Sequence, residues 1–157
     1  MAVKRELLTI GWREWVELPQ LTPVAIKGKI DTGARTSTLH AFDTELTNID
    51  GREHVTFEIH PHQRSRRDPS TVTVPVTAHK KIRSSTGHAE LRPVISTEVR
   101  IGEATFEIEL TLTSRDRMGF RLLLGRSALR RRYVVDAARS FTQGQENSNQ
   151  RKKSRTR

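Results

Sequence analysis

The residues best suited to chemistry form a short run after a β-type stretch. Residues 24–30 (Val-Ala-Ile-Lys-Gly-Lys-Ile) are followed by Asp31, Thr32 and Gly33. An acid at a strand end can act as an acid or a base, the hydroxyl can lock a neighbour by hydrogen bonding, and the glycine lets another backbone or a water approach closely. The triplet alone is equally typical of an ordinary turn in which aspartate bonds its own backbone. Its meaning therefore depends on what the rest of the chain places beside it.

A second element of interest lies about ninety residues further along the chain. Residues 122–129 (Leu-Leu-Leu-Gly-Arg-Ser-Ala-Leu) predict an apolar strand, then Gly125 and Arg126, then a helix. Between the two elements, the polar turn 84–88 joins two extended arms and predicts a projecting hairpin. That hairpin is either a flap that closes over a substrate or a plain mobile hairpin.

At these residues the chain resembles the retropepsin-like aspartic peptidases, in which an Asp-Thr-Gly-Ala loop is backed by an apolar-apolar-Gly-Arg segment. The small bacterial family called ATP-dependent zinc proteases is similar at residues 11–16, 29–37, 39–42, 115–118, 123–126 and 135–140. The resemblance spans residues 10–141 and implies a retropepsin-like closed β-barrel. It implies the following site: catalytic Asp31; active-site loop Thr32, Gly33, Ala34 and Arg35; flap residues Ser85, Thr86, Gly87 and His88; structural support from Gly125 and Arg126.

The chemistry of an aspartic peptidase requires two carboxylates that share one water and one proton. The chain has a single Asp-Thr-Gly. We therefore expect a homodimer in which Asp31 faces Asp31 of its partner and a peptide or protein is hydrolysed. The alternative is a non-proteolytic adaptor that uses the same dimer to regulate a partner enzyme. The resemblance suggests which partner, because some family members are linked to ATP-grasp glutamate ligases that modify a ribosomal protein.

Two arginines mark a departure from the viral members of the resembled family. Those relatives carry an acid shortly after the loop, and it can pair with the arginine that corresponds to Arg126. This chain has Arg35 and Thr36 after the loop instead. Arg126 therefore needs another acceptor, either Asp136 or a main-chain carbonyl. Arg35 favours an ionised Asp31 or an acidic group on the substrate. The sequence thus predicts a preference for acidic peptides.

The sequence gives little support to the zinc and ATP of the family's label. There is no cysteine and no His-Glu-x-x-His, and Pro61 interrupts the spacing between His60 and His62. There is no Gly-x-x-x-x-Gly-Lys-Ser/Thr loop for a nucleotide. We expect no metal and no cofactor, and we assign any dependence on ATP to a partner.

The bulk composition predicts one β-rich domain with a basic tail. About nine short alternating strands and one late helix, residues 126–132, predict an all-β fold over residues 1–141. Residues 142–157 predict a disordered tail, with five Lys or Arg against one Glu in a chain of net charge +10. The tail favours weak, non-specific attraction to nucleic acid or the ribosome, although a solvated face is the simpler interpretation. Without a leader or a membrane segment, we expect a cytoplasmic protein.

Overall fold

The fold is built almost entirely from β-strands. A computed structural model describes residues 6–83, 87–114 and 119–144. The strands in these ranges are β1 (Leu8–Gly11), β2 (Arg13–Val16), β3 (Ile26–Ile30), β4 (Ser37–His40), β5 (Phe42–Ile49), β6 (Arg52–Ile59), β7 (Ser70–Pro75), β8 (Ala78–Arg83), β9 (Ala89–Ile101), β10 (Ala104–Thr113), β11 (Leu122–Leu124) and β12 (Tyr133–Asp136). The β-rich class expected from the sequence is confirmed.

One short helix, α1 (Arg126–Leu129), occurs in the described part of the chain. It is shorter than the expected 126–132, because Arg130 has left helical geometry and Arg131 has a φ of 67°. The short helix near the C-terminal end is otherwise as predicted. None of the described residues belongs to a helix of the length and apolar character that crossing a membrane demands.

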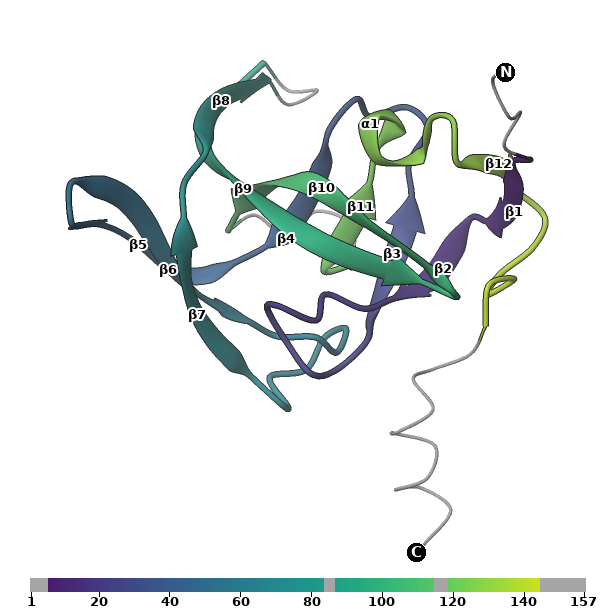
Figure 1. Cartoon of the computed structure of the whole chain (residues 1–157), viewed down its shortest axis with the longest axis horizontal. Helices are drawn as coiled ribbons and strands as arrows, with labels where there is room; N and C mark the ends of the chain where they lie inside the picture. The colour runs from purple at the N-terminus through teal and green to yellow at the C-terminus, as the bar shows by residue number, and fades with distance from the viewer. Residues whose placement is uncertain (1–5, 84–86, 115–118, 145–157) are drawn as a thin grey trace, which may run out of the picture.

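The strands form three sheets (Figure 1). The largest has seven strands in the order β2-β3-β11-β4-β10-β9-β8, and β11 is parallel to β3 but antiparallel to β4. A second sheet has the order β5-β6-β7, and its β5–β6 hairpin projects from the body of the molecule. The third pairs β1 with β12 in parallel, which brings the two ends of the described chain together.

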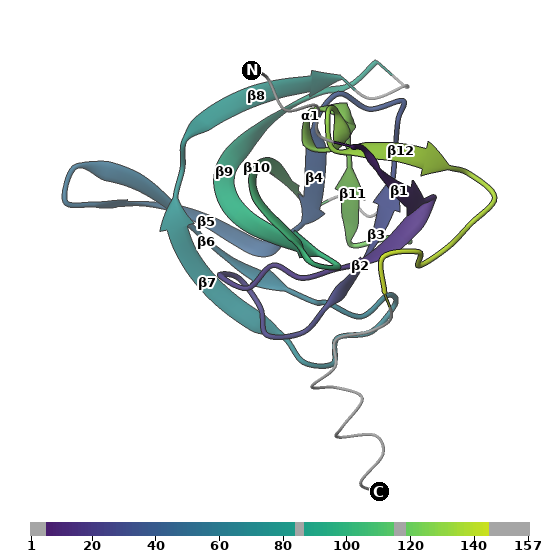
Figure 2. The ribbon, with the colours of Figure 1, turned by 45° about the vertical axis from the view of Figure 1, so that its right-hand side comes forward.

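The expected closed barrel is not what the strand ladders form. The long strands β9 and β10 curve around the molecule (Figure 2). In the described residues, however, the large sheet meets itself only at a single bridge between Glu17 and Arg100, with both N···O distances 2.9 Å. β2 is four residues long, and Pro19 soon after it has no N–H to extend a ladder. The sheet is therefore strongly curved but open.

The core follows the alternation predicted for the individual strands. In β6, Val55, Phe57 and Ile59 are buried while the residues between them are half-buried. The turn before β6 has positive φ at Asp50 (51°) and Gly51 (81°), the geometry of a two-residue hairpin loop. β7 lies at the edge of its sheet, as Pro75 predicts, because proline cannot donate to a further strand.

A buried carboxylate ties the C-terminal segment to the N-terminal strands. Glu14 is fully buried, and its two oxygens accept hydrogen bonds from the N–H groups of Gly11, Thr142 and Gln143 and from the Thr142 hydroxyl, at 2.7–3.0 Å. The tail expected to begin at residue 142 therefore starts inside a segment bound to the fold. Residues 145–157, the rest of that expected tail, lie outside the described part.

Candidate active site

Asp31 is the first residue after β3, at the surface of the molecule. Its N–H donates to the carbonyl of Leu124 at 2.8 Å, which continues the parallel pairing of β3 with β11. Ile30 is buried, Asp31 is half-buried, and Thr32 and Gly33 are exposed. The buried strand thus fixes the main chain of Asp31, and the turn that follows carries its side chain to the surface.

The Asp31 carboxylate is held by its own turn. Oδ1 accepts a hydrogen bond from the Gly33 N–H at 3.0 Å, and the Asp31 carbonyl accepts one from the Ala34 N–H at 3.2 Å. A Cβ on Gly33 would lie 3.2 Å from Oδ1, so a larger residue would crowd the acid. Across the described residues Asp31 makes no ion pair, and Arg35 in particular does not lock it. The carboxylate is oriented and remains accessible.

The start of α1 braces the loop through main-chain and side-chain bonds. The N–H of Arg126 donates to the carbonyl of Ala34 at 2.8 Å, and the N–H of Ser127 donates to that of Arg35 at 3.0 Å. The Arg126 side chain adds a bond from Nη1 to the carbonyl of Thr32, also at 3.0 Å. The acceptor of Arg126 is therefore a main-chain carbonyl of the loop. These three bonds connect α1 to three successive parts of the turn.

Gly125 allows the close approach between this segment and the loop. A Cβ at this position would lie 2.4 Å from the carbonyl oxygen of Thr36 and 2.9 Å from that of Ala34. The Gly125 N–H donates to the buried hydroxyl of Ser37 at 3.0 Å. Ser37 is a part of the brace that the sequence interpretation missed. Its only signal was a small hydroxyl residue at the start of the strand after the loop.

The flap candidates lie at the end of the β8–β9 hairpin. β8 pairs antiparallel with β9 as far as Arg83 and Ala89. Ser85 and Thr86 fall outside the described residues, whereas Gly87 and His88 are described and exposed, Gly87 with a φ of 85°. Both views place this end of the hairpin on the same side of the molecule as α1 (Figures 1 and 2).

The surroundings of the loop are basic. Arg35 in the loop is exposed, and so are Arg126 and Arg130, one turn apart in and just after α1. Such a group of cations attracts anionic groups in a salt-dependent way.

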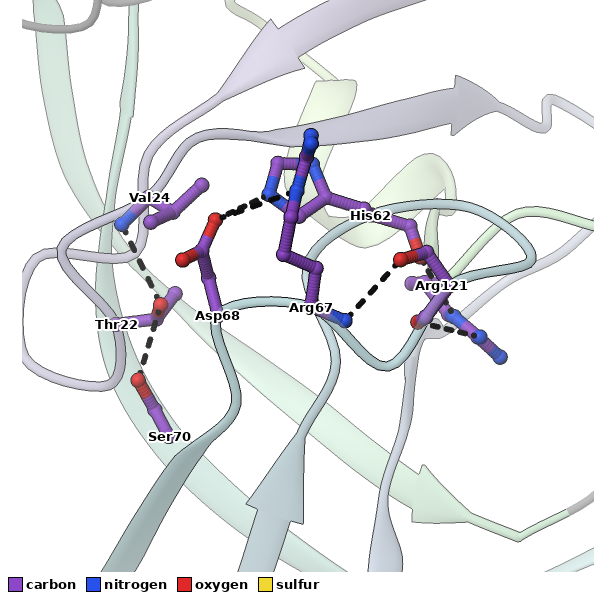
Figure 3. A network of polar contacts seen from close by, with 8 residues as sticks. Thr22, Val24, His62, Arg67, Asp68, Ser70 and Arg121 are labelled. Atoms are coloured by element: carbon purple, nitrogen blue, oxygen red, sulfur yellow. Dashed lines mark hydrogen bonds and ion pairs between the residues drawn. The ribbon is translucent and has the colours of Figure 1, made fainter.

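The histidines considered for a metal bind separate carboxylates. His60 Nε2 contacts Glu58 at 2.9 Å, and His62 Nε2 contacts Asp68 at 2.7 Å, as Figure 3 shows for the second pair. No cluster of three or more His, Asp or Glu side chains suited to a metal is present in the described ranges.

Comparison with known proteins connects this geometry to a family. A family model described as "Retropepsin-like aspartic endopeptidase RimB" (RimB-like) matches residues 9–146. Proteins of Shewanella halifaxensis and Desulfotalea psychrophila, both named probable alpha-L-glutamate ligase, are each 43% identical to this chain in the matched region. These matches cover 88% and 82% of this chain but only 30% and 28% of the relatives. The chain thus spans less than a third of their length.

A solved structure supports the fold. The crystal structure of a Legionella pneumophila protein of unknown function (DUF785) superposes with a TM-score of 0.73 at 24% identity. The match covers 88% of this chain and 99% of that one. The likeness is one of architecture and includes nearly all of the Legionella chain.

Proposed function

The chain belongs to the RimB-like family of retropepsin-like aspartic endopeptidases, and from this premise we propose that it hydrolyses peptide bonds as a homodimer with one Asp31 from each chain. The resemblance noted in the sequence is thereby confirmed. The observation that carries the proposal is the accessible Asp31 carboxylate, held by the Gly33 N–H in a loop braced from β11 and α1.

The proposed mechanism requires two copies of this loop. Two carboxylates close together share one proton, because both cannot ionise at short range. One then removes a proton from the water, and the other donates a proton to the carbonyl oxygen of the substrate. Thr32 would hold the two loops together across the two-fold axis, and Gly33 would leave room for the water. The peptidase domain would extend past residue 141 to include Thr142 and Gln143.

We further propose that the substrate is an acidic peptide. The support is the exposed group Arg35, Arg126 and Arg130 around the loop. Nη1 of Arg126 donates to the carbonyl of Thr32, and the other N–H groups of the guanidinium can donate to a substrate carboxylate. The hairpin end with Gly87 and His88 would close over the bound chain and exclude water.

The test is a peptide-library cleavage assay that compares wild type with Asp31→Asn. The matched control is Asp136→Asn, because Asp136 Oδ1 also accepts an N–H two residues on, from Ala138, at 3.0 Å. We expect cleavage to fall by at least about 100-fold in Asp31→Asn, since the dyad loses its proton-transfer group, and to persist in Asp136→Asn. Cleavage that survives Asp31→Asn would refute the assignment. Loss on adding a chelator alone would point to a metal instead.

The proposed dimer is tested separately from cleavage. Size-exclusion chromatography with light scattering should give the mass of two chains at micromolar concentration, with or without substrate. A monomer that still cleaves peptides would exclude a shared dyad.

The second candidate function is a non-proteolytic adaptor for a glutamate ligase. It is favoured by the relatives named probable alpha-L-glutamate ligase, which contain a segment like this chain within a longer one. Their names suggest a glutamate ligase as the partner of this chain, and the resemblance noted in the sequence implies a ligase of the ATP-grasp class. The adaptor predicts that Asp31→Asn still binds and modulates a purified ligase while no peptide is cleaved by either variant. Cleavage by wild type alone would decide for the peptidase.

A further inference from the structure

A cavity of about 680 Å³ lies away from the Asp31 loop, against the outer side of β2 and β3. Its lining residues are Trp12, Arg13, Trp15, Lys27, Pro61, His62, Gln63, Arg64, Gly119 and Phe120. Residues 61–64 form the wall opposite the two strands. The cavity is within the size range of small-molecule sites and far larger than a single inorganic anion needs.

The lining combines aromatic rings with cations. Trp12, Trp15 and Phe120 provide the rings, and Trp12 meets Phe120 edge to face at 6.1 Å between centroids. The guanidinium of Arg13 lies 4.6 Å from the Trp12 ring, and the Lys27 ammonium lies 5.4 Å from the Trp15 ring. Among the described residues, those that line the cavity include three permanent cations and no carboxylate. The cavity is therefore suited to a ligand that is both planar and anionic.

The wall opposite the strands is fixed in place by polar contacts (Figure 3). The buried Arg121 donates to the carbonyls of His62 and Ser65, each at 3.4 Å. His62 is held by Asp68 at 2.7 Å, and the Arg67 N–H donates to the Ser65 hydroxyl at 3.1 Å. These bonds orient residues 61–64 before any ligand arrives, which lowers the entropy cost of binding.

We propose that this cavity binds a nucleotide unit, with the base against the tryptophans and the phosphate near Lys27 and Arg64. Bases stack on aromatic side chains and on guanidinium groups, and phosphates pair with lysine and arginine. An acidic peptide supplies the negative charge but no planar group for the three rings. The unit can come from a free nucleotide or from single-stranded RNA, since both have the same base and phosphate.

The site is separate from the proposed catalytic loop. Lys27 is on β3, and Asp31 follows it by four residues, about 13 Å along the chain. Trp12 is nearer, because its carbonyl accepts the N–H of Ile30 at 2.8 Å. None of the loop residues 31–35 lines the cavity, which therefore lies beside the loop without including it.

Tryptophan fluorescence should report on binding in this cavity, because the chain has two tryptophans and both line it. Adenosine 5′-monophosphate and an eight-nucleotide single-stranded RNA should each be titrated into the full-length chain while tryptophan fluorescence is followed. We expect saturable quenching. Response to the RNA alone identifies a polymer, and equal response to the monophosphate identifies a free nucleotide.

The decisive variant is the double substitution Lys27→Gln with Arg64→Gln. Neither side chain has a hydrogen bond or ion pair in the described structure, so the fold should survive. We expect at least about tenfold weaker binding and a salt dependence of log K reduced by about 1.4, as two lost contacts to a single strand predict. The control is Lys81→Gln on β8, the strand at the opposite end of the large sheet from β2.

Three results would overturn the proposal. The first is no saturable quenching by either ligand up to about 1 mM, the weakest affinity expected of a specific small-ligand site. The second is RNA binding that the double variant leaves unchanged or that Lys81→Gln weakens equally. The third is tighter binding of a pentaglutamate peptide than of the RNA in the same titration.

Discussion

Replacing Glu14 with glutamine should lower the free energy of unfolding, because this carboxylate joins the two ends of the fold. Glu14 is on β2 and fully buried, and its partners are Gly11, Thr142 and Gln143. Thr142 and Gln143 also reach the carbonyl of Thr9 through their side chains. A loss at Glu14 therefore weakens the attachment of the whole C-terminal segment.

The expected cost follows from the individual bonds. Oε2 accepts three hydrogen bonds, from the Gly11 N–H, the Thr142 N–H and the Thr142 hydroxyl, and Oε1 accepts one from the Gln143 N–H. In its best orientation glutamine keeps the first three as neutral bonds of roughly half the strength and turns its NH₂ towards the Gln143 N–H. A lost charge-assisted bond costs about 1.5–3 kcal/mol. Three bonds at half strength and one lost bond sum to about 4–7 kcal/mol. A neutral amide costs less to bury than a carboxylate, which offsets part of this sum. We therefore expect the free energy of unfolding to fall by about 3 kcal/mol.

Urea unfolding followed by circular dichroism measures this change, and calorimetry should show a Tm lower by about 6–12 °C. The matched control is Glu17→Gln, whose carboxylate is partly exposed and makes one ion pair with Arg100 at 2.6 Å. That substitution should cost at most about 1 kcal/mol. If Glu14→Gln costs no more than Glu17→Gln, the buried carboxylate does not hold the termini and the reasoning fails.

Two further predictions concern the brace and the core. Gly125→Ala should cost about 1–3 kcal/mol and reduce cleavage at least tenfold, because the new Cβ would lie 2.4 Å from the Thr36 carbonyl oxygen and must displace the loop. The control is Gly51→Ala in the β5–β6 turn, which costs stability through its positive φ but has open space around it and should leave cleavage unchanged. Burial raises the pKa of Tyr133 above its ordinary value of 10.0. The positive charge of Arg132 lowers this pKa, and the negative charge of Glu14 raises it further. The folded state thus holds this proton more tightly, so stability is level below pH 10 and falls above it; Tyr133→Phe should lessen that alkaline fall in urea melts, and an unchanged fall would refute the attribution.

The sequence predicted local elements well because their signals are local. Alternating apolar residues such as Val55, Phe57 and Ile59 place a strand face without knowledge of its neighbours. The Asp50-Gly51 hairpin follows from the tolerance of glycine for positive φ. Closure of the barrel is different, because it depends on how many residues pair between two strands that are distant in the sequence. Pro19 signals the end of β2, but nothing local shows that the pairing with β9 stops at one bridge.

Side-chain partners far apart in the sequence were the part that could not be predicted. Glu14 alternates with half-buried neighbours on β2, and no pattern shows that its partners lie at 142 and 143. No sequence pattern around Trp12 and Trp15 shows that both are half-buried and line a cavity. Their role depends on residues 61–64, which a polar, proline-punctuated stretch does not place in space.

The construction of the Asp31 loop bears on the proposed dimer. Its described supports are the Leu124 carbonyl, the N–H groups of Arg126 and Ser127, and the Arg126 side chain. In the described residues no other carboxylate bonds to Asp31, whose Oδ1 has its partner in Gly33. Bonds of this kind fix where the acid points without supplying the second acid that must share its proton. A rigid half-site with an accessible carboxylate is what a two-fold partner could complete, and cleavage per chain should therefore rise with protein concentration until dimerisation is saturated.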